Sequence, residues 1–137
     1  MKKIKQLRKR KKRVSRRAKR GIHNSPKCPT PINYRSGWEL KYALHLDANL
    51  NVVSYRYEPY AIEYVSNYKT GKRRNYWPDF EVKMADGRLI LVEIKPKRKL
   101  TLLTNVKKFA AASAMCVLKE MTFQIVTEVD LKALGLL

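Results

Sequence analysis

Three charged residues in two short motifs have the types and the spacing to do chemistry together. Asp79 lies in a Trp-Pro-Asp-Phe motif, and after thirteen intervening residues Glu93 and Lys95 lie in a Val-Glu-Ile-Lys motif. Side chains of a strand alternate between its two faces, so Glu93 and Lys95 share one face and Ile94 points to the other. The second motif therefore places an acid and a lysine side by side if it forms a strand.

Two carboxylates beside a backbone carbonyl form an all-oxygen site that suits Mg²⁺ or Mn²⁺. We expect Asp79, Glu93 and the backbone carbonyl of Ile94 to bind Mg²⁺, with Mn²⁺ as a substitute. Such a metal lowers the pKa of a bound water and stabilises charge on a phosphate. Lys95 is placed to orient the water and to stabilise the phosphate electrostatically. Glu39 could supply a further ligand or hydrogen-bond a metal-bound water.

The same residues also have an ordinary interpretation. An isolated Glu-x-Lys pair on a strand is usually a solvated ion pair that contributes little to stability. The run Leu89–Val92 is apolar on both faces, however, which is typical of a central strand. Ionised residues at the end of a buried strand need a compensating role. We interpret Glu58 and Glu63 as structural residues and Asp86 as a turn residue.

Whether Asp79 joins Glu93 depends on the turn that connects their strands. A two-residue turn would place Asp79 on the wrong face of the sheet. A three-residue loop, Ala85–Gly87, places Asp79 directly opposite Glu93. The commonest three-residue loop needs a left-handed residue at its third position, where Gly87 lies. The sequence therefore favours the register that assembles the site.

Periodicity and turn residues predict alternating helices and strands after residue 35. Ser36 and Glu39 have the Ser-x-x-Glu form of a capping box at a helix start, and this role alone would explain Glu39. The polar segment 67–73 is typical of a hairpin turn. The expected elements are a helix at 37–48, strands at 52–58, 61–66, 76–84 and 88–95, a helix at 102–118, a strand at 121–127 and a helix at 130–136.

These elements predict an α/β fold in which helices flank a mixed β-sheet core. The last strand is expected to be parallel because a helix crosses over to it. In the helix at 37–48, Trp38, Tyr42, Ala43 and Leu46 recur at helical spacing and are expected to face the core. The expected buried positions of the second helix are Val106, Phe109, Ala110 and Val117.

Positive charge is concentrated at the N-terminus. The formal net charge is +20, and the first 38 residues contain 15 Lys or Arg and no Asp or Glu. The remaining residues carry 16 basic and 11 acidic side chains, a net +5. A block of like charges favours a polyanionic partner, above all nucleic acid, because neutralised phosphates release counterions. We expect residues 1–34 to be a mostly disordered nucleic-acid-binding tail and linker, and residues 35–137 to form the catalytic domain.

The expected DNA contacts are basic side chains of the tail and of the segment just after the second motif. No apolar run reaches the length of a membrane span, and the apolar stripe of residues 1–20 is thin for an interfacial helix, so no membrane partner is expected. The start also lacks the apolar stretch of a signal peptide. The predicted contacts are Lys2, Lys3, Arg8, Arg10, Arg13, Arg16, Arg17, Lys19, Arg20, Lys97 and Arg98.

The cysteines and histidines do not indicate a metal site. Cys28 and Cys116 lie in different contexts, and neither they nor His23 and His45 have metal-ligand spacing. A reducing intracellular environment is the expectation.

At these residues the chain resembles the PD-(D/E)XK nuclease superfamily over about residues 35–128. The segment Tyr34–Glu39 (Tyr-Arg-Ser-Gly-Trp-Glu) is similar to the opening helix of TnsA-type endonuclease domains and of the head-completion nucleases of tailed phages. Segment 51–55, the two motifs above, the Phe109-Ala-Ala run and segment 123–128 continue the match in order. Phage junction resolvases of the endonuclease I type share the Ser-Gly-x-Glu, Pro-Asp-Phe and Val-Glu-x-Lys elements more loosely.

The resemblance implies a restriction-endonuclease-like fold and a Mg²⁺-dependent DNA endonuclease, with Glu39, Asp79, Glu93 and Lys95 in the catalytic positions. The single-domain length and the opening Tyr-Arg-Ser-x-Trp-Glu favour the phage head-completion type, which would process DNA ends at the packaged capsid. The implied partners are DNA and phage head or neck proteins such as the portal or connector. The expected location is the host cytoplasm or the virion.

Several alternatives remain open. Within the enzyme class, the chain could cleave transposon ends, as TnsA-type proteins do, or resolve branched junctions, and its oligomeric state is open. Outside that class, a DNA-binding virion protein with an inactive site would also explain the basic leader. An RNA-binding protein would explain the leader but leaves the acidic residues unexplained.

Deletion of residues 1–20 should weaken DNA binding strongly and flatten its salt dependence, because this segment carries most of the excess positive charge. Cleavage at saturating DNA should remain largely intact. Binding measured at several salt concentrations tests the first effect, and an unchanged salt slope after the deletion would refute the role.

Overall fold

The structure is a computed structural model that describes residues 20–137. The expectations for residues 1–19, namely disorder and DNA contacts from Lys2 through Lys19, lie outside the described residues. Within residues 20–137, no helix combines the length and the apolar character needed to cross a membrane.

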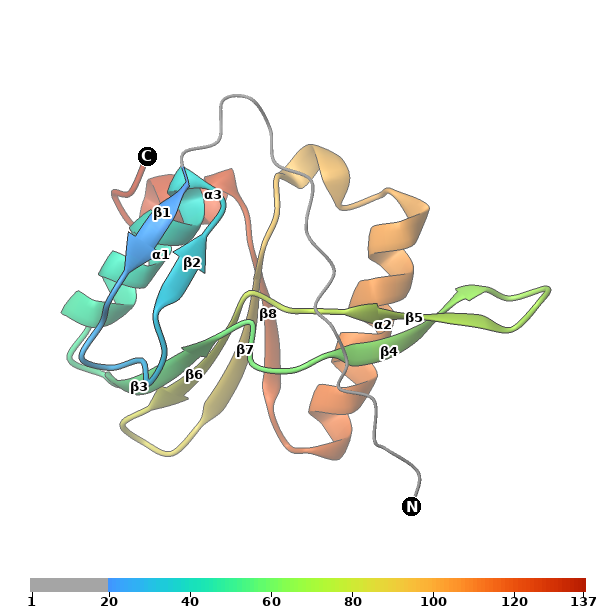
Figure 1. The fold of residues 1–137 in the computed structure, drawn as a ribbon, viewed down its shortest axis with the longest axis horizontal. Coiled ribbons are helices and arrows are strands. Elements are labelled where there is room, and N and C mark those ends of the chain that lie inside the picture. Colours follow the sequence, from blue (N-terminus) through green and yellow to red (C-terminus); the bar gives the residue numbers. More distant parts are fainter. Residues whose placement is uncertain (1–19) are drawn as a thin grey trace, which may run out of the picture.

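A four-stranded mixed sheet forms the centre of the molecule, in the order β3-β6-β7-β8 (Figure 1). Its strands are β3 (Val52–Tyr57), β6 (Phe80–Met84), β7 (Leu89–Ile94) and β8 (Thr122–Val126). β3, β6 and β7 are antiparallel neighbours, and β8 is parallel to β7, as predicted. β7 has a strand on each side, and Leu91 and Val92 are at most 1% exposed. The prediction of a central, doubly covered strand is therefore confirmed.

Helices cover both faces of this sheet. Helices α1 (Gly37–Ala48) and α3 (Glu128–Ala133) share one hydrophobic cluster with Phe80 and Val92. Helix α2 (Leu103–Leu118) shares the other cluster with Leu91. Figure 1 shows α1 and α2 on opposite sides of the strands. This is the mixed sheet flanked by helices that the sequence predicted.

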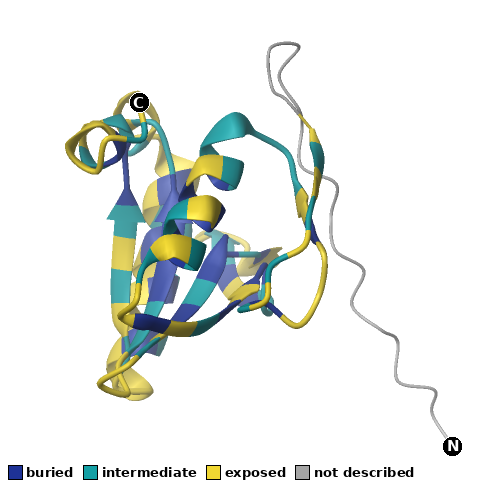
Figure 2. Ribbon diagram, turned by 90° about the vertical axis from the view of Figure 1, so that its left-hand side faces the viewer, coloured by how far each residue is buried: buried dark blue, intermediate teal, exposed yellow. Residues whose placement is uncertain are grey.

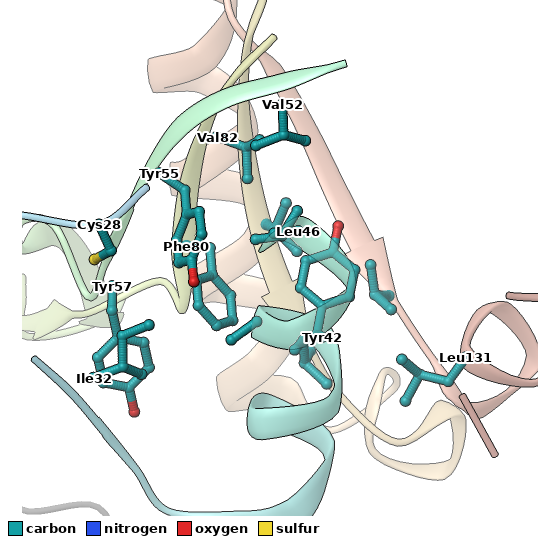
Figure 3. Packing of buried hydrophobic residues seen from close by; sticks show 14 residues of the cluster. Cys28, Ile32, Tyr42, Leu46, Val52, Tyr55, Tyr57, Phe80, Val82 and Leu131 are labelled. Carbon is teal, nitrogen blue, oxygen red and sulfur yellow. The ribbon is translucent and has the colours of Figure 1, made fainter. Parts of the chain in front are cut away.

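Helix α1 begins where predicted and packs its apolar side on the sheet. The Ser36 hydroxyl caps the helix by accepting the Glu39 N–H at 3.2 Å. Tyr42, Ala43 and Leu46 are buried, and the Tyr42 ring lies 5.6 Å from that of Phe80. These side chains fill the space between α1 and the strands (Figure 3), and the strands that α1 covers are largely buried (Figure 2).

Helix α2 buries a different side from the one that we predicted. Phe109 is buried as expected, but Val106 and Val117 are 48% and 76% exposed, and Ala110 is also exposed. The residues that it buries are Asn105, Phe109, Ala112 and Cys116. The helix carries apolar residues on more than one side, so periodicity alone could not choose the buried one. Burial of Asn105 is balanced by the bond from its Nδ2 to the Lys99 carbonyl, 2.8 Å away.

The expected strand at 76–84 is divided in two. Its first residue, Tyr76, ends strand β5 (Lys72–Tyr76), and β6 starts at Phe80 after a break at 77–79. β5 pairs only with β4 (Ile62–Asn67), and this separate hairpin projects from the body of the molecule (Figure 1). The predicted turn at 67–73 therefore includes the first residues of β5.

Residues 21–34, which we expected to be an extended connector, are part of the fold. Strands β1 (Gly21–His23) and β2 (Ile32–Tyr34) form a two-stranded sheet. Ile32 is 0% exposed, Cys28 is 8% exposed, and both belong to the core cluster between α1 and the sheet. The prolines of this segment indicated a connector, whereas its burial depends on contacts with residues far along the chain.

Asp47, near the end of α1, anchors this N-terminal hairpin. Its carboxylate lies 2.7 Å from His23 Nε2 and accepts hydrogen bonds from the hydroxyls of Ser25 and Tyr55. Burial alone would raise the pKa of Asp47, but these bonds outweigh it and hold the pKa below its ordinary value. The stabilisation is therefore present near neutral pH and is lost as the pH falls through the lowered pKa.

The buried hairpin leads to a direct test. Ile32→Ala should lower the free energy of unfolding by about 3 kcal/mol, because it removes a fully buried side chain and leaves a cavity. Ile22→Ala in the same hairpin should change it by less than about 0.5 kcal/mol, because Ile22 is 67% exposed. Urea unfolding of both variants measures the difference. Equal effects would show that residues 21–34 are not part of the core.

Candidate active site

The turn between β6 and β7 sets which residues of the two strands meet. Met84 N–H donates to the Arg88 carbonyl at 2.9 Å, and Gly87 has a φ of 90°. The three-residue loop with a left-handed glycine is therefore confirmed. The pairs run from Lys83 with Leu89 to Phe80 with Val92. Asp79 lies one residue beyond the last pair, and extending this register by one step would set it opposite Glu93, the arrangement that the sequence predicts.

Asp79 is held at the start of β6, on the edge of the break that separates it from β5. The carboxylate is 2% exposed, and its Oδ2 accepts the Ile94 N–H at 2.7 Å. Asp79 N–H donates to the Val92 carbonyl at 3.1 Å. The side chain thus takes the place of a backbone acceptor in the ladder, which fixes it against the end of β7.

Glu93 lies between a tyrosine and the lysine of its own motif. The Tyr76 hydroxyl donates to Glu93 Oε2 at 2.6 Å, and Lys95 Nζ lies 3.4 Å from Oε1. Glu93 is 2% exposed, whereas the Lys95 side chain is 26% exposed. Burial, reinforced by Glu93, raises the pKa of Tyr76 far above its ordinary value, so the phenol remains a donor. Lys95 therefore lies between the buried Glu93 and the solvent.

Glu39 reaches the site from the α1 layer. Its Oε2 accepts the Arg35 N–H at 2.6 Å and lies 3.2 Å from the Tyr57 hydroxyl. The capping box is therefore only half formed, because the carboxylate bonds the N–H of Arg35 and not that of Ser36. Burial and the nearby carboxylates raise the pKa of Tyr57 above its ordinary value, which keeps its hydroxyl protonated.

Sequence reasoning missed a buried ion pair beside these residues. Arg35 Nη1 contacts Glu58 Oε1, and the Glu58 side chain is 0% exposed. Glu58 has a φ of 43°, and its N–H donates to the Asp79 carbonyl at 2.7 Å. Burial alone would lower the pKa of Arg35, but Glu58 and its neighbours raise it, so the guanidinium stays charged. From the sequence we interpret Glu58 as a structural residue. The signal available for a place beside the site is its position between the end of a strand and Pro59.

The tyrosines that orient the acids also escaped prediction. Tyr57 ends β3 and Tyr76 ends β5, so the two hydroxyls reach Glu39 and Glu93 from strands of different sheets. The sequence showed only that these strands are rich in tyrosine. Which tyrosine meets which carboxylate depends on how the separate strands are arranged in space.

The donor set fits a metal held by two carboxylates. Among residues 20–137, no three His, Cys, Asp or Glu side chains are gathered closely enough to hold a metal ion. Asp79 is bonded to the end of β7 that carries Glu93, whereas Glu39 is bonded to the Arg35 N–H before α1. Mg²⁺ commonly binds one or two carboxylates and keeps several waters. Asp79 and Glu93 could therefore hold Mg²⁺ with a backbone carbonyl such as that of Ile94, and Glu39 could bond a water.

The basic residues predicted after the second motif are at the surface. Lys97 and Arg98 lie in a single 3-10 turn, η1 (Lys97–Lys99), which follows Lys95 and Pro96, and both are exposed. Arg20, the one predicted tail contact within the described residues, is exposed too. Cations at the rim offset the repulsion that buried carboxylates exert on an approaching polyanion.

Comparison with known proteins adds an independent finding. Residues 49–128 match the family described as TnsA-like endonuclease N terminal. The head completion nuclease of Enterobacteria phage T4 is 30% identical over 129 aligned residues, which cover 78% of this chain and 85% of that protein. The matched segment contains Asp79, Glu93 and Lys95.

The role of Gly87 in the register can be tested directly. Gly87→Ala should lower the free energy of unfolding by roughly 1–2 kcal/mol, because an L side chain is strained at this positive φ. Gly37→Ala, in the first turn of α1 where an added Cβ meets nothing within 4 Å, should be neutral or slightly stabilising. Chemical denaturation of both variants measures this. A stable Gly87→Ala protein would mean that the turn does not need its left-handed residue.

Proposed function

We propose that this chain, which belongs to the TnsA-like N-terminal endonuclease family, is a Mg²⁺-dependent enzyme that hydrolyses phosphodiester bonds in DNA. The observation that carries the proposal is the register of β6 and β7. It brings Asp79 to the end of a buried central strand, where its carboxylate bonds the Ile94 N–H beside Glu93, with Lys95 3.4 Å from Glu93. Membership of the family gives the class of chemistry, and the geometry of the strands supports the assignment of the residues that perform it.

In this proposal Asp79 and Glu93 hold Mg²⁺, together with the Ile94 carbonyl and water. The metal, when bound, supplies positive charge that lowers the pKa of a water and offsets the charge of the phosphate. The Ile94 N–H fixes Asp79 and the Tyr76 hydroxyl fixes Glu93, so neither carboxylate has to reorient during the reaction. Such preorganisation is a main source of electrostatic catalysis.

Lys95 acts on the substrate from the exposed side of the site. Its ammonium lies 3.4 Å from Glu93 Oε1 and is partly open to solvent. It can donate hydrogen bonds to a phosphate oxygen and to the attacking water at once, since an ammonium has three donors. This arrangement orients the water and stabilises the charge that develops on the phosphate.

Glu39 and the Arg35–Glu58 pair act as positioning residues. Glu39 is fixed by the Arg35 N–H and by Tyr57, and can accept a hydrogen bond from a metal-bound water. The Arg35 guanidinium is held by Glu58 and is 23% exposed. In this proposal it contacts the phosphate backbone beside the acidic residues, since a planar guanidinium suits bidentate phosphate contacts.

The biological role that we propose is processing of DNA ends during phage head completion. The likeness to the phage T4 head completion nuclease over 85% of that protein supports it. Head or neck proteins such as the portal or connector would then be partners, in the host cytoplasm or the virion. The alternative is cleavage of transposon ends, which the TnsA-like family description favours.

Wild-type protein should convert supercoiled plasmid to nicked or linear forms with Mg²⁺ or Mn²⁺, and chelation should stop this. Asp79→Asn and Lys95→Ala should each lower the rate by about 10²-fold or more. Asp86→Asn, the same change in the exposed turn of the same hairpin, should leave the rate unchanged. Cleavage rates with matched unfolding curves measure the effect.

Activity without added divalent metal, or an active Asp79→Asn protein, would contradict the proposed site. The same assay on linear, nicked and four-way-junction DNA separates the roles. A preference for linear ends supports head completion, whereas a preference for junctions supports a resolving enzyme.

A further inference from the structure

We propose that the β4–β5 hairpin and the first half of α2 form a second DNA contact, a pocket for backbone phosphates outside the hydrolytic site. This inference rests on the proposed function, because it assumes that the polyanion is DNA. It concerns the cations Lys72, Arg74 and Lys107, none of which the sequence analysis assigned. Figure 1 shows the hairpin extending past α2 and away from the central sheet.

Strand alternation places two of these cations on one face of the hairpin. Arg74 pairs with Tyr64, and Tyr76 pairs with Ile62. Ile62, Tyr64 and Tyr76 are buried in the cluster that includes α2 residues. Lys72 and Arg74 therefore lie on the same face of β5 as Tyr76, nearer to the tip of the hairpin. The base of this face packs on α2. Both are exposed, so their charges are available to a ligand.

A pocket of about 340 Å³ lies where this face meets α2. Lys72 and Arg74 line it from the hairpin, and Thr104 and Lys107 line it from α2. Ser66 and Asn67 add polar groups from the end of β4, and no carboxylate is among its lining residues. Lysine, arginine, hydroxyl and amide side chains are the groups that proteins use to contact DNA phosphates.

Lys107 is held in place by the hairpin. Its ammonium donates to the Ser66 carbonyl at 2.8 Å and lies 4.7 Å from the centre of the Tyr68 ring. These contacts connect α2 to the end of β4, so Lys107 is fixed in the pocket that Lys72 and Arg74 also line. A group fixed before binding loses less side-chain entropy when the ligand arrives.

The opposite face of the hairpin has a different charge pattern. There Arg73 Nη1 forms an ion pair with Glu63 Oε1 at 2.9 Å, diagonally across the strands, so a carboxylate accompanies the cation. Segment 67–76 contains four basic residues and no acid, and the one acidic residue of the hairpin is on this outer face. Of the three other cations of the segment, Lys72 and Arg74 line the pocket and Lys69 lies in the turn.

The hairpin also leads directly to the hydrolytic site. Tyr76, at the inner end of β5, donates to Glu93, and Lys72 lies four residues further out, about 13 Å along the strand. A strand of DNA whose phosphate occupies the hydrolytic site could place phosphates further along in the pocket. Because the hydrolytic site is rich in buried carboxylates, affinity for DNA has to come from such flanking cations.

The test compares two pairs of substitutions that remove the same net charge from the same hairpin in the full-length chain. One variant is Lys72→Ala with Arg74→Ala, on the pocket face. The control is Lys69→Ala with Arg73→Ala, in the turn and on the outer face. All four residues are exposed, and unfolding curves check that both variants fold. Binding to a short blunt-ended duplex is measured in EDTA over a range of salt concentrations.

A plot of log K against log salt has a negative slope, to which each phosphate contact contributes about 0.9 in magnitude. Loss of two contacts in the pocket variant should therefore make the slope less steep by about 1.8. Its affinity loss between about 50 and about 200 mM salt should then be roughly tenfold smaller than that of wild type. The control should change the slope by much less. Lys72→Arg with Arg74→Lys should restore the wild-type slope.

Equal slope changes in both variants, or none in either, would overturn the inference, since the hairpin would then act only through diffuse charge or through a different acidic partner. The outcome is independent of hydrolysis. If wild type cleaves plasmid but the pocket variant behaves like the control, only the phosphate pocket fails. If wild type does not cleave but the pocket variant shows the expected weaker salt dependence of DNA binding, the DNA contact stands and the proposed hydrolysis fails.

Discussion

Burial of carboxylates beside the central strand is the constraint on which the rest of this structure depends. A charged carboxylate removed from water is costly unless hydrogen bonds or cations replace the lost hydration. Each buried acid of the site has such a donor: the Ile94 N–H for Asp79, Tyr76 for Glu93, and the Arg35 N–H for Glu39. The break after β5 and the hairpin that projects from it supply donors that a continuous strand could not have placed there.

The segment before α1 also supplies hydrogen-bond donors to buried acids of the site. Arg35 provides its backbone N–H to Glu39 and its guanidinium to Glu58, so one residue serves two buried acids. It follows β2 directly, and β2 is fixed because Ile32 is fully buried. The N-terminal hairpin is therefore coupled to the site through the main chain. Loosening of that hairpin would move the donors that hold the acids.

Charge is arranged to match this acidic centre. In the proposed function the buried carboxylates hold a divalent cation, and exposed basic side chains around the site contact the DNA. Lys95 stands at the rim, η1 continues outward from it, and the pocket beside Arg74 lies further along the hairpin. Long-range attraction brings the polyanion to the surface, while fixed hydrogen bonds inside the site determine the geometry of the chemistry.

The sequence by itself determined what depends on neighbouring residues. Gly87 fixed the turn, and the turn fixed the register of β6 and β7, because a left-handed residue at the third loop position specifies the register locally. Alternation then placed Lys95 with Glu93. Only the tertiary structure decided which donors meet the acids and which side of α2 is buried. Several of those contacts join residues from separate elements, such as Tyr76 and Glu93, which are 17 positions apart, and no local pattern specifies how separate elements pack.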